Sequence, residues 1–300
     1  MKLVTLNDGT ALPPIGYGLP MIPDTERTYE AVRHALQVGY RLIDTAAAYL
    51  NEKEVGRAVR ASGIPRGDIY ITSKLWLQDY GYEEAKKGID ASLKALGTDY
   101  IDLYLLHHPY FDVVGSWKAL EEAQKAGKIR SIGVSNMTPR LWSIYIPQFD
   151  TVPAVNQVEF NPLCQQKELR KMLEPINVRI EAMYPLSHGN RELLEHPFIL
   201  SLAQKYGREP AQVILRFEVQ CGTIPIPRAI MPVRADATNE LYGFEMTPEE
   251  MATANLNIFD FELTKEEMEE MGALDTGRGE YDPDAPGIDD LLLNSYKVHE

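Results

Sequence analysis

The chain has 300 residues, a length that a single α/β barrel domain can occupy without dividing. Its 44 acidic and 30 basic residues give a formal net charge of −14, which argues against a surface for nucleic acid or for an anionic membrane. The hydrophobic fraction of 44% and the charged fraction of 25% are ordinary for a soluble globular protein.

The sequence also shows no sign of a signal peptide, a membrane span, a disulfide framework or a cysteine-bound metal. The N-terminal residues lack the long apolar core of a signal peptide, and no apolar stretch is long enough to span a bilayer. The two cysteines, Cys164 and Cys221, have no paired spacing, so neither a disulfide framework nor a zinc site is indicated. We therefore expect a cytoplasmic protein, and nothing in the sequence demands more than a monomer.

The first predicted element is a β-hairpin, because residues 4–12 alternate around the Asp8-Gly9 turn. After it, short apolar runs alternate with amphipathic helical segments. The apolar runs predict eight strands, near residues 15–19, 40–44, 69–74, 101–106, 130–134, 153–158, 178–182 and 223–226.

Helical patterns fill the intervals between these strands. Three of them are predicted at 25–38, 82–96 and 117–126, and Pro210 begins another, at an early helical position where its missing N–H costs nothing. Eight alternating strands and helices favour an α/β fold of the (β/α)8 TIM barrel type over an open doubly wound sheet. No G-x-G-x-x-G or P-loop motif occurs.

The predicted domain organisation is one barrel over residues 1–300, with the hairpin before it and a tail after it. The interval at about 230–246 is unusually long for a loop after the last strand, and we interpret it as an insertion. The tail is acidic and rich in proline and glycine from Tyr281 to Asp290, and we expect it to lie across the barrel.

Four ionisable residues lie at or just past the ends of successive predicted strands. Asp44 ends one strand and is soon followed by Tyr49, Lys74 ends the next strand, and His107 follows the third. The C-terminal ends of the strands in a parallel barrel meet at one mouth, where active sites form. The sequence therefore predicts that these four side chains share a pocket.

Together the four groups can move a proton at a carbonyl oxygen. A free phenol has a pKa near ~10, and a nearby ammonium lowers it by stabilising the phenolate. Lys74 would supply that charge to Tyr49 and Asp44 would hold Lys74, while His107 would orient the substrate oxygen. Singly, each residue has a structural explanation as a helix cap, a packing residue or a solvated charge, but their joint placement favours catalysis.

Four stretches of the sequence carry a family resemblance. They are residues 41–49, 72–76, 102–107 and 133–136, which read RLIDTAAAY, TSKLW, DLYLLH and GVSN. In these motifs the chain resembles the aldo-keto reductase superfamily, and it is most similar to the bacterial 2,5-diketogluconate reductase-like branch. The resemblance implies NAD(P)H-dependent reduction of small aldehydes, ketones or keto-sugars, with Asp44, Tyr49, Lys74 and His107 as the catalytic residues.

The resemblance also implies cofactor contacts. Ser135, Asn136 and Gln157 occupy positions that hydrogen-bond the nicotinamide carboxamide, and all three residue types can do so; Ser135 and Asn136 could alternatively cap a helix. Leu186 and Ser187 fall in a stretch that resembles the loop around the pyrophosphate.

Several positions depart from the family pattern. Met183 stands where an aromatic ring usually stacks under the nicotinamide, although a thioether can still pack against that ring. Pro20 replaces an aromatic residue of the substrate pocket, which leaves Trp76, Tyr110 and Phe111 as its apolar walls.

The adenosine end of the cofactor site has mixed signals. Arg228 resembles the basic residue that meets the 2′-phosphate, and Asn255 matches a further contact. Glu250 stands where the family tends to place an arginine, and a carboxylate would repel a phosphate. Residues 247–250 also read as a capping box, which explains Glu250 structurally. We expect NADP(H), with NAD(H) as the alternative.

Metal binding is not predicted. His107 and His108 are neighbours on a strand, so we expect their side chains to point to opposite faces, and the other histidines lack ligand spacing. Two rival functions stay open at this point. One is a lyase that uses Lys74 as a Schiff-base nucleophile, and the other is a cofactor-binding regulatory protein with little turnover.

Overall fold

The structure is a computed structural model that describes residues 2–21, 23, 25–228 and 247–299. The insertion expected at about 230–246 lies outside these residues and stays a prediction. No helix within the described ranges is long and apolar enough to cross a bilayer.

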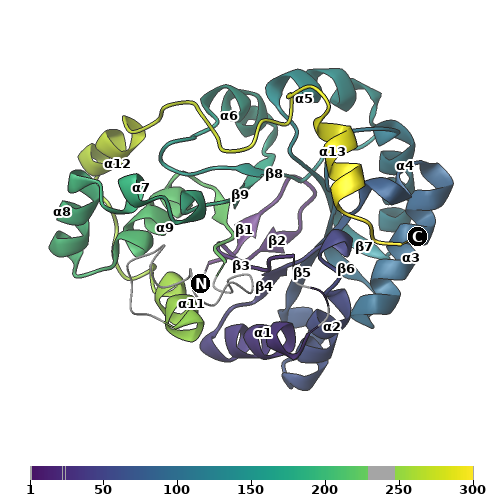
Figure 1. Cartoon of the computed structure of the whole chain (residues 1–300), viewed down its shortest axis with the longest axis horizontal. Coiled ribbons are helices and arrows are strands. Elements are labelled where there is room, and N and C mark those ends of the chain that lie inside the picture. Colours follow the sequence, from purple (N-terminus) through teal and green to yellow (C-terminus); the bar gives the residue numbers. More distant parts are fainter. Residues whose placement is uncertain (1, 22, 24, 229–246, 300) are drawn as a thin grey trace.

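Eight parallel strands form one sheet in chain order, from β3 to β10. The sheet closes because the N–H groups of Gly16 and Gly18 donate to the carbonyls of Pro225 and Pro227, at 2.9 and 3.0 Å. Figure 1 shows the strands at the centre with helices around them. The (β/α)8 TIM barrel is therefore confirmed. Its strands are β3 (Tyr17–Gly18), β4 (Leu42–Asp44), β5 (Tyr70–Leu75), β6 (Ile101–Leu106), β7 (Ile129–Ser135), β8 (Val155–Glu159), β9 (Arg179–Met183) and β10 (Ile224–Pro225).

The closing strand β3 needs glycine because it lies so near to the backbone after β10. A Cβ atom on Gly18 would lie 2.9 Å from the carbonyl oxygen of Ile226, and one on Gly16 would lie 2.5 Å from the Ile226 side chain. Both distances are too short for a real side chain, so the two glycines permit closure.

The α-helices of the described chain connect and cover the strands (Figure 1). Thr25 caps the first of them by accepting a hydrogen bond from the N–H of Thr28. The fourth begins at Val113 rather than at 117, because Asp112 caps it through the N–H of Gly115. The helices are α1 (Glu26–Val38), α2 (Glu52–Ala61), α3 (Tyr82–Leu96), α4 (Val113–Lys125), α5 (Pro139–Tyr145), α6 (Lys167–Leu173), α7 (Arg191–Leu194), α8 (Pro197–Tyr206), α9 (Pro210–Gln220), α11 (Pro248–Leu256), α12 (Lys265–Gly272) and α13 (Ile288–Ser295).

The predicted N-terminal hairpin forms the floor of the barrel. Strands β1 (Val4–Thr5) and β2 (Ala11–Leu12) pair antiparallel, and Asn7 donates to the carbonyl of Pro153, just before β8, at 3.0 Å. The hairpin side chains join the apolar interior of the lower barrel, which comprises Leu6, Leu12, Leu42, Leu103, Leu105, Ala154, Val155, Ile224 and Ile226. This apolar packing seals the end of the barrel that lies opposite the strand ends.

The tail lies along the rim of the barrel, as expected. In Figure 1 the yellow segment after α12 passes β8 and α5 before it reaches α13. Trp76 donates its indole N–H to the carbonyl of Tyr296 at 2.8 Å, and Arg140 forms an ion pair with Asp284. Side chains of α13, among them Leu292 and Leu293, pack on a small apolar cluster around Trp76.

Candidate active site

Asp44 and Lys74 form a buried ion pair at the C-terminal ends of β4 and β5. The ammonium of Lys74 donates to both carboxylate oxygens of Asp44, at 2.7 and 2.9 Å, and to the carbonyl of Thr45 at 2.9 Å. Burial is the largest single effect and lowers the pKa of Lys74, but the neighbouring acidic groups, Asp44 foremost, together outweigh it, so the net effect raises this pKa. Lys74 is fully buried and stays a cation at neutral pH.

Tyr49 and His107 lie beside this ion pair. Tyr49 ends a short 3₁₀ helix (Ala47–Tyr49) after β4, and its ring centroid is 5.0 Å from Nζ of Lys74 and 5.7 Å from the imidazole of His107. Trp76 packs edge-on against His107 at 5.1 Å. The structure thus brings together all four residues that we predicted from the strand ends.

His107 is buried and electrically neutral. Burial lowers the pKa of its imidazole well below the ordinary value, and His108 and the Lys74 ammonium add to this effect. Its Nδ1 atom is buried and has no hydrogen bond to the described residues. At neutral pH His107 can therefore donate a hydrogen bond to a substrate oxygen but does not supply a positive charge.

The predicted opposite orientation of His107 and His108 is wrong. Their rings stack with centroids 4.9 Å apart and planes 9° apart, because β6 ends at Leu106 and alternation of side chains holds only within a strand. His108 Nδ1 lies 3.3 Å from Nδ2 of Asn136 and 3.3 Å from the hydroxyl of Tyr281. Burial lowers the pKa of His108 to about 3, so it is neutral as well.

Gln157 links the ion pair to a second carboxyl group. Its Nε2 donates to Oδ2 of Asp44 at 2.8 Å and to Oε2 of Glu181 at 2.9 Å. Glu181 is buried in the barrel, and β8 and β9 place it directly opposite Gln157 in the sheet register. The polar interior below the mouth therefore comprises Asp44, Lys74, Gln157 and Glu181.

Ser135 is the last residue of β7, Asn136 follows it, and both lie next to these groups. The Ser135 hydroxyl donates to the carbonyl of Gln157 at 2.9 Å, and Asn136 Nδ2 donates to the carbonyl of His107 at 3.0 Å. Asn136 has a positive φ of 60°, a conformation that asparagine tolerates better than most residues. A carboxamide oxygen would bind here only if one of these internal hydrogen bonds were exchanged.

The segment after β9 has an unusual backbone. Tyr184, Ser187 and His188 all have positive φ, at 52°, 46° and 52°, a conformation that costs energy for residues other than glycine. Met183 is half-buried before this segment, and Leu186 packs on the core. The strain coincides with the stretch that we predicted to surround a pyrophosphate.

Glu280 of the tail and Arg228, which follows β10, approach this segment. Ser187 donates to Oε1 of Glu280 at 2.8 Å, and the guanidinium of exposed Arg228 lies 5.1 Å from the centroid of the Tyr184 ring. Asn255 is buried in α11. Arg228 and Ser187 therefore lie on one side of the mouth.

Glu250 has the structural role that we considered for it. The Thr247 N–H donates to its carboxylate at 2.7 Å, and its own N–H donates to the Thr247 hydroxyl at 3.2 Å. This confirms the capping box of α11. An effect of Glu250 on cofactor choice stays a prediction.

The predicted walls of the substrate pocket differ in exposure. Trp76 and Pro20 are buried, whereas Phe111 is 47% exposed on a backbone with positive φ. Tyr110 donates to the carbonyl of Pro283 in the tail at 2.7 Å, and Tyr281 lies beside it. The tail therefore contributes to this wall.

Sequence reasoning missed three residues of this region: Glu159, Glu181 and Tyr281. Glu181 interrupts the apolar run of β9 at an inward position, a signal that alternation could have revealed. Glu159 accepts hydrogen bonds from the N–H groups of Glu280 and Tyr281, at 2.7 and 3.3 Å. These two contacts join residues more than 120 positions apart, and no local pattern predicts such pairs.

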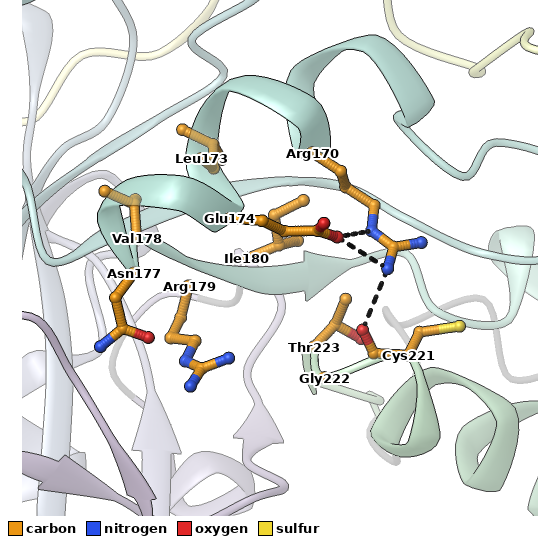
Figure 2. A pocket seen from close by; sticks show the side chains of 10 residues that line it. All are labelled: Arg170, Leu173, Glu174, Asn177, Val178, Arg179, Ile180, Cys221, Gly222 and Thr223. Atoms are coloured by element: carbon orange, nitrogen blue, oxygen red, sulfur yellow. Dashed lines mark hydrogen bonds and ion pairs between the residues drawn. The ribbon is translucent and has the colours of Figure 1, made fainter.

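A separate recess lies at the opposite end of the strands (Figure 2). Its walls include Arg179 at the start of β9 and Gly222 and Thr223 just before β10. Arg170 on its wall donates to Glu174 at 3.0 Å and to the carbonyl of Cys221 at 3.3 Å. This recess does not contact the predicted catalytic residues.

Metal and disulfide chemistry find no support in the described part of the chain. No group of three or more potential ligands is assembled there. Cys164 and Cys221 are free thiols, and burial raises the pKa of each to about 12, so neither is a reactive thiolate.

The fold and the polar mouth define a TIM-barrel enzyme. A family model described as the aldo/keto reductase family matches residues 14–276. The chain belongs to this family and is an oxidoreductase.

Individual relatives agree with this family. An aldo-keto reductase from Mycolicibacterium smegmatis is 44% identical over 255 residues, which cover 83% of this chain and 91% of that protein. The crystal structure of an aldo/keto reductase from Brucella melitensis superimposes with a TM-score of 0.81 at 38% identity, covering 91% of this chain and 99% of the other. The structure of a Bombyx mori aldo-keto reductase in complex with NADP has a TM-score of 0.82 at 28% identity, covering 94% and 95% of the two chains.

Proposed function

We propose that this oxidoreductase reduces small aldehydes, ketones or keto-sugars to alcohols with NADPH, with NADH as the alternative cofactor. The observation that carries the proposal is the joint placement of Tyr49, Lys74, Asp44 and His107 at one mouth, with Lys74 fully buried and paired to Asp44. A fixed cation beside a phenol and a neutral imidazole suits a carbonyl oxygen that gains a proton.

The residues at the mouth fit a nicotinamide cofactor. No described donor reaches Oε1 of Gln157, which is free to accept from a carboxamide N–H. The exposed Arg228 offers a cation to phosphate groups, and the Ser187 hydroxyl would donate to one by exchanging its hydrogen bond to Glu280. The cation of Arg228 supports NADPH over NADH, and the structure bound to NADP in the Bombyx mori relative supports the same choice.

The chain's own residues would act on the carbonyl oxygen. When bound, the cofactor supplies a hydride to the carbonyl carbon. Tyr49 donates its proton to the oxygen, Lys74 stabilises the resulting phenolate, and Asp44 holds Lys74 in place. His107 donates a hydrogen bond that orients the substrate, and Trp76, Tyr110 and the tail exclude water from the reacting groups.

The contacts of Lys74 disfavour the lyase alternative. A Schiff-base nucleophile must be a neutral amine, whereas the net effect of its surroundings raises the pKa of Lys74. Its ammonium also donates to three acceptors at once, which leaves no free electron pair. The sequence similarity to the 2,5-diketogluconate reductase-like branch leads us to place keto-sugars and α-dicarbonyls among the substrates to be tried first.

Substitution of the general acid tests the proposal. We expect Tyr49→Phe to lower kcat by roughly 10²–10⁴-fold, because the phenol proton is lost while the ring still packs. NADPH and NADH oxidation at 340 nm with small aldehydes, α-dicarbonyls and keto-sugars provides the measurement. Tyr70→Phe, which removes a hydroxyl at the floor side of β5, is the control and should keep full activity.

The outcomes separate the hypotheses. Turnover that Tyr49→Phe leaves intact would rule out Tyr49 as the proton donor. Tight NADPH binding without turnover of any tested carbonyl would favour the cofactor-binding regulatory protein instead.

A further inference from the structure

Gln157 bridges two carboxyl groups with one nitrogen atom, and this arrangement determines which way its amide faces. Asp44 is ionised because it is paired with Lys74, so its Oδ2 can only accept a hydrogen bond. The Gln157 atom at 2.8 Å from that oxygen must therefore be Nε2. The same nitrogen lies 2.9 Å from Oε2 of Glu181, so both of its hydrogens are engaged.

We propose that Glu181 is a positioning residue for cofactor binding, because it accepts the second Nε2 hydrogen of Gln157 and thereby fixes Oε1 as the atom that the amide offers to a carboxamide N–H. This inference rests on the proposed function and names the residue that sets its specificity for the carboxamide group. The Asp44 carboxylate engages one Nε2 hydrogen and Glu181 engages the other, so the two acceptors together hold the amide more rigidly than Asp44 would alone.

The burial and the neighbours of Glu181 keep its carboxyl group in a fixed position, where it can accept a hydrogen bond from Gln157. Glu181 is fully buried, and the groups that influence it are Asp44 on β4, Lys74 and Thr72 on β5, and Gln157 on β8. Burial, followed by the charge of Asp44, raises the pKa of Glu181 to about 8. At neutral pH it is mainly a protonated acid, which leaves Lys74 paired with one negative charge.

The protonated form can still accept from Gln157. The bond from Gln157 reaches Oε2, whereas Oε1 of Glu181 is buried without a hydrogen bond to the described residues. A proton on Oε1 leaves Oε2 as a carbonyl-type acceptor. A glutamine at this position would keep the same acceptor, and a leucine of similar size would remove it.

The experiment compares two ligands whose difference lies at the carboxamide. Isothermal titration calorimetry of the full chain would measure the Kd of NADP⁺ and of its 3-acetylpyridine analogue, in which a methyl group replaces the NH₂. We expect the wild type to bind NADP⁺ about tenfold more tightly than the analogue, which is the effect of one hydrogen bond of about 1.4 kcal/mol. Glu181→Gln should retain that ratio, and Glu181→Leu should reduce it to about threefold or less.

The ratio distinguishes positioning from general support of the fold. A purely structural role would weaken both ligands equally and leave the ratio unchanged, and that result in Glu181→Leu would overturn the inference. If circular dichroism shows that Glu181→Leu is unfolded, Glu181→Met, with a flexible side chain, replaces it under the same criteria.

The wild-type measurement separates the two levels of the argument. A wild type that binds both ligands equally would overturn the role of Glu181 and Gln157 while leaving the proposed reductase in place. A wild type that binds neither NADP⁺ nor NADPH would refute the proposed function and the inference with it.

Discussion

Lys74 is an ammonium with no exposed surface, and its three short hydrogen bonds show how the barrel keeps it charged. Burial of an unpaired cation is very costly, so Asp44 and the Thr45 carbonyl are needed to keep Lys74 charged in the role that we propose for it beside Tyr49. The cost of desolvation is met inside the fold, and the cation is therefore fixed before any substrate arrives. Such preorganised charge is a large contribution to catalysis in enzymes.

Glu218 on α9 is a buried acid of a different kind. Both of its carboxyl oxygens are buried without a hydrogen bond to the described residues, and burial raises its pKa well above the ordinary value. The folded protein thus binds this proton more tightly than the unfolded chain does. The free energy of unfolding therefore falls as the pH rises above the ordinary carboxyl pKa of about 4.3.

We predict that Glu218→Gln stabilises the protein at pH 8, because it removes the need to bury or protonate a carboxylate. The melting temperature should rise by about 2 °C or more, which corresponds to about 1 kcal/mol, and the gain should shrink at pH 5. Differential scanning calorimetry at both pH values checks this. Glu266→Gln, on the exposed face of α12, is the control, and a wild type that is more stable than Glu218→Gln at pH 8 would contradict the argument.

Strands β5 and β6 are joined by a side-chain hydrogen bond in addition to the backbone hydrogen bonds of the sheet. The carboxylate of Asp102, buried on β6, accepts from the N–H of Ile71 at 3.0 Å and pairs with Arg66 and Arg130 at 2.7 and 3.1 Å. One side chain thereby satisfies a buried backbone donor and two arginines at the lower end of the barrel.

We predict that Asp102→Ala lowers the free energy of unfolding by about 3 kcal/mol, because a buried N–H and a partly buried guanidinium lose their acceptor. Urea denaturation followed by circular dichroism provides the measurement. The matched control is Asp90→Ala, which breaks the exposed pair with Lys128 and should cost less than about 1 kcal/mol. Equal losses in the two variants would show that burial of Asp102 is unimportant.

Element-level prediction succeeded where local patterns determine the structure. The apolar runs located all eight strands, and the Asp8-Gly9 turn located the hairpin. The start of α4 was missed because the cap at Asp112 precedes the periodic part of the helix. The stacking of His107 on His108 was missed because the strand ends one residue earlier, and periodicity gives no information beyond that point.

The proximity of the predicted site residues could be inferred as far as the fold itself brings strand ends together. The proximity of Asp44, Tyr49 and His107 to Lys74 follows from barrel topology. The pairing of Gln157 with Glu181 depends instead on the register of β8 against β9. The contacts of the tail depend on where a long segment without regular structure turns, which no strand or helix pattern specifies.

At the scale of the whole molecule, the tail is held to the barrel mouth by a few polar contacts. Glu159 accepts from two successive N–H groups of the tail, and Ser187 donates to Glu280. The tail therefore connects the end of β8 with the segment after β9.

We predict that Glu159→Gln loosens the tail, because hydrogen bonds to a charged acceptor contribute roughly 1.5–3 kcal/mol. Trypsin should cleave after the exposed Arg278 about tenfold faster than in the wild type, since cleavage follows the population of the open segment. Mass spectrometry of a digestion time course gives the rates. Glu174→Gln, in the separate recess beside the start of β9, is the control. An unchanged cleavage rate in Glu159→Gln would contradict a holding role for Glu159.

Because the hairpin covers the floor of the barrel, the two ends of the described chain differ in how a support or fusion partner attached there would affect access to the mouth. The hairpin closes the barrel on the side away from the reacting groups, whereas Val298 and His299 contact Gln78 and Asp79, beside Trp76. A surface or a fusion partner joined ahead of the hairpin would leave the mouth open to reactants, and one joined after His299 would crowd it. Immobilisation for use as a catalyst should therefore be made through the amino-terminal side.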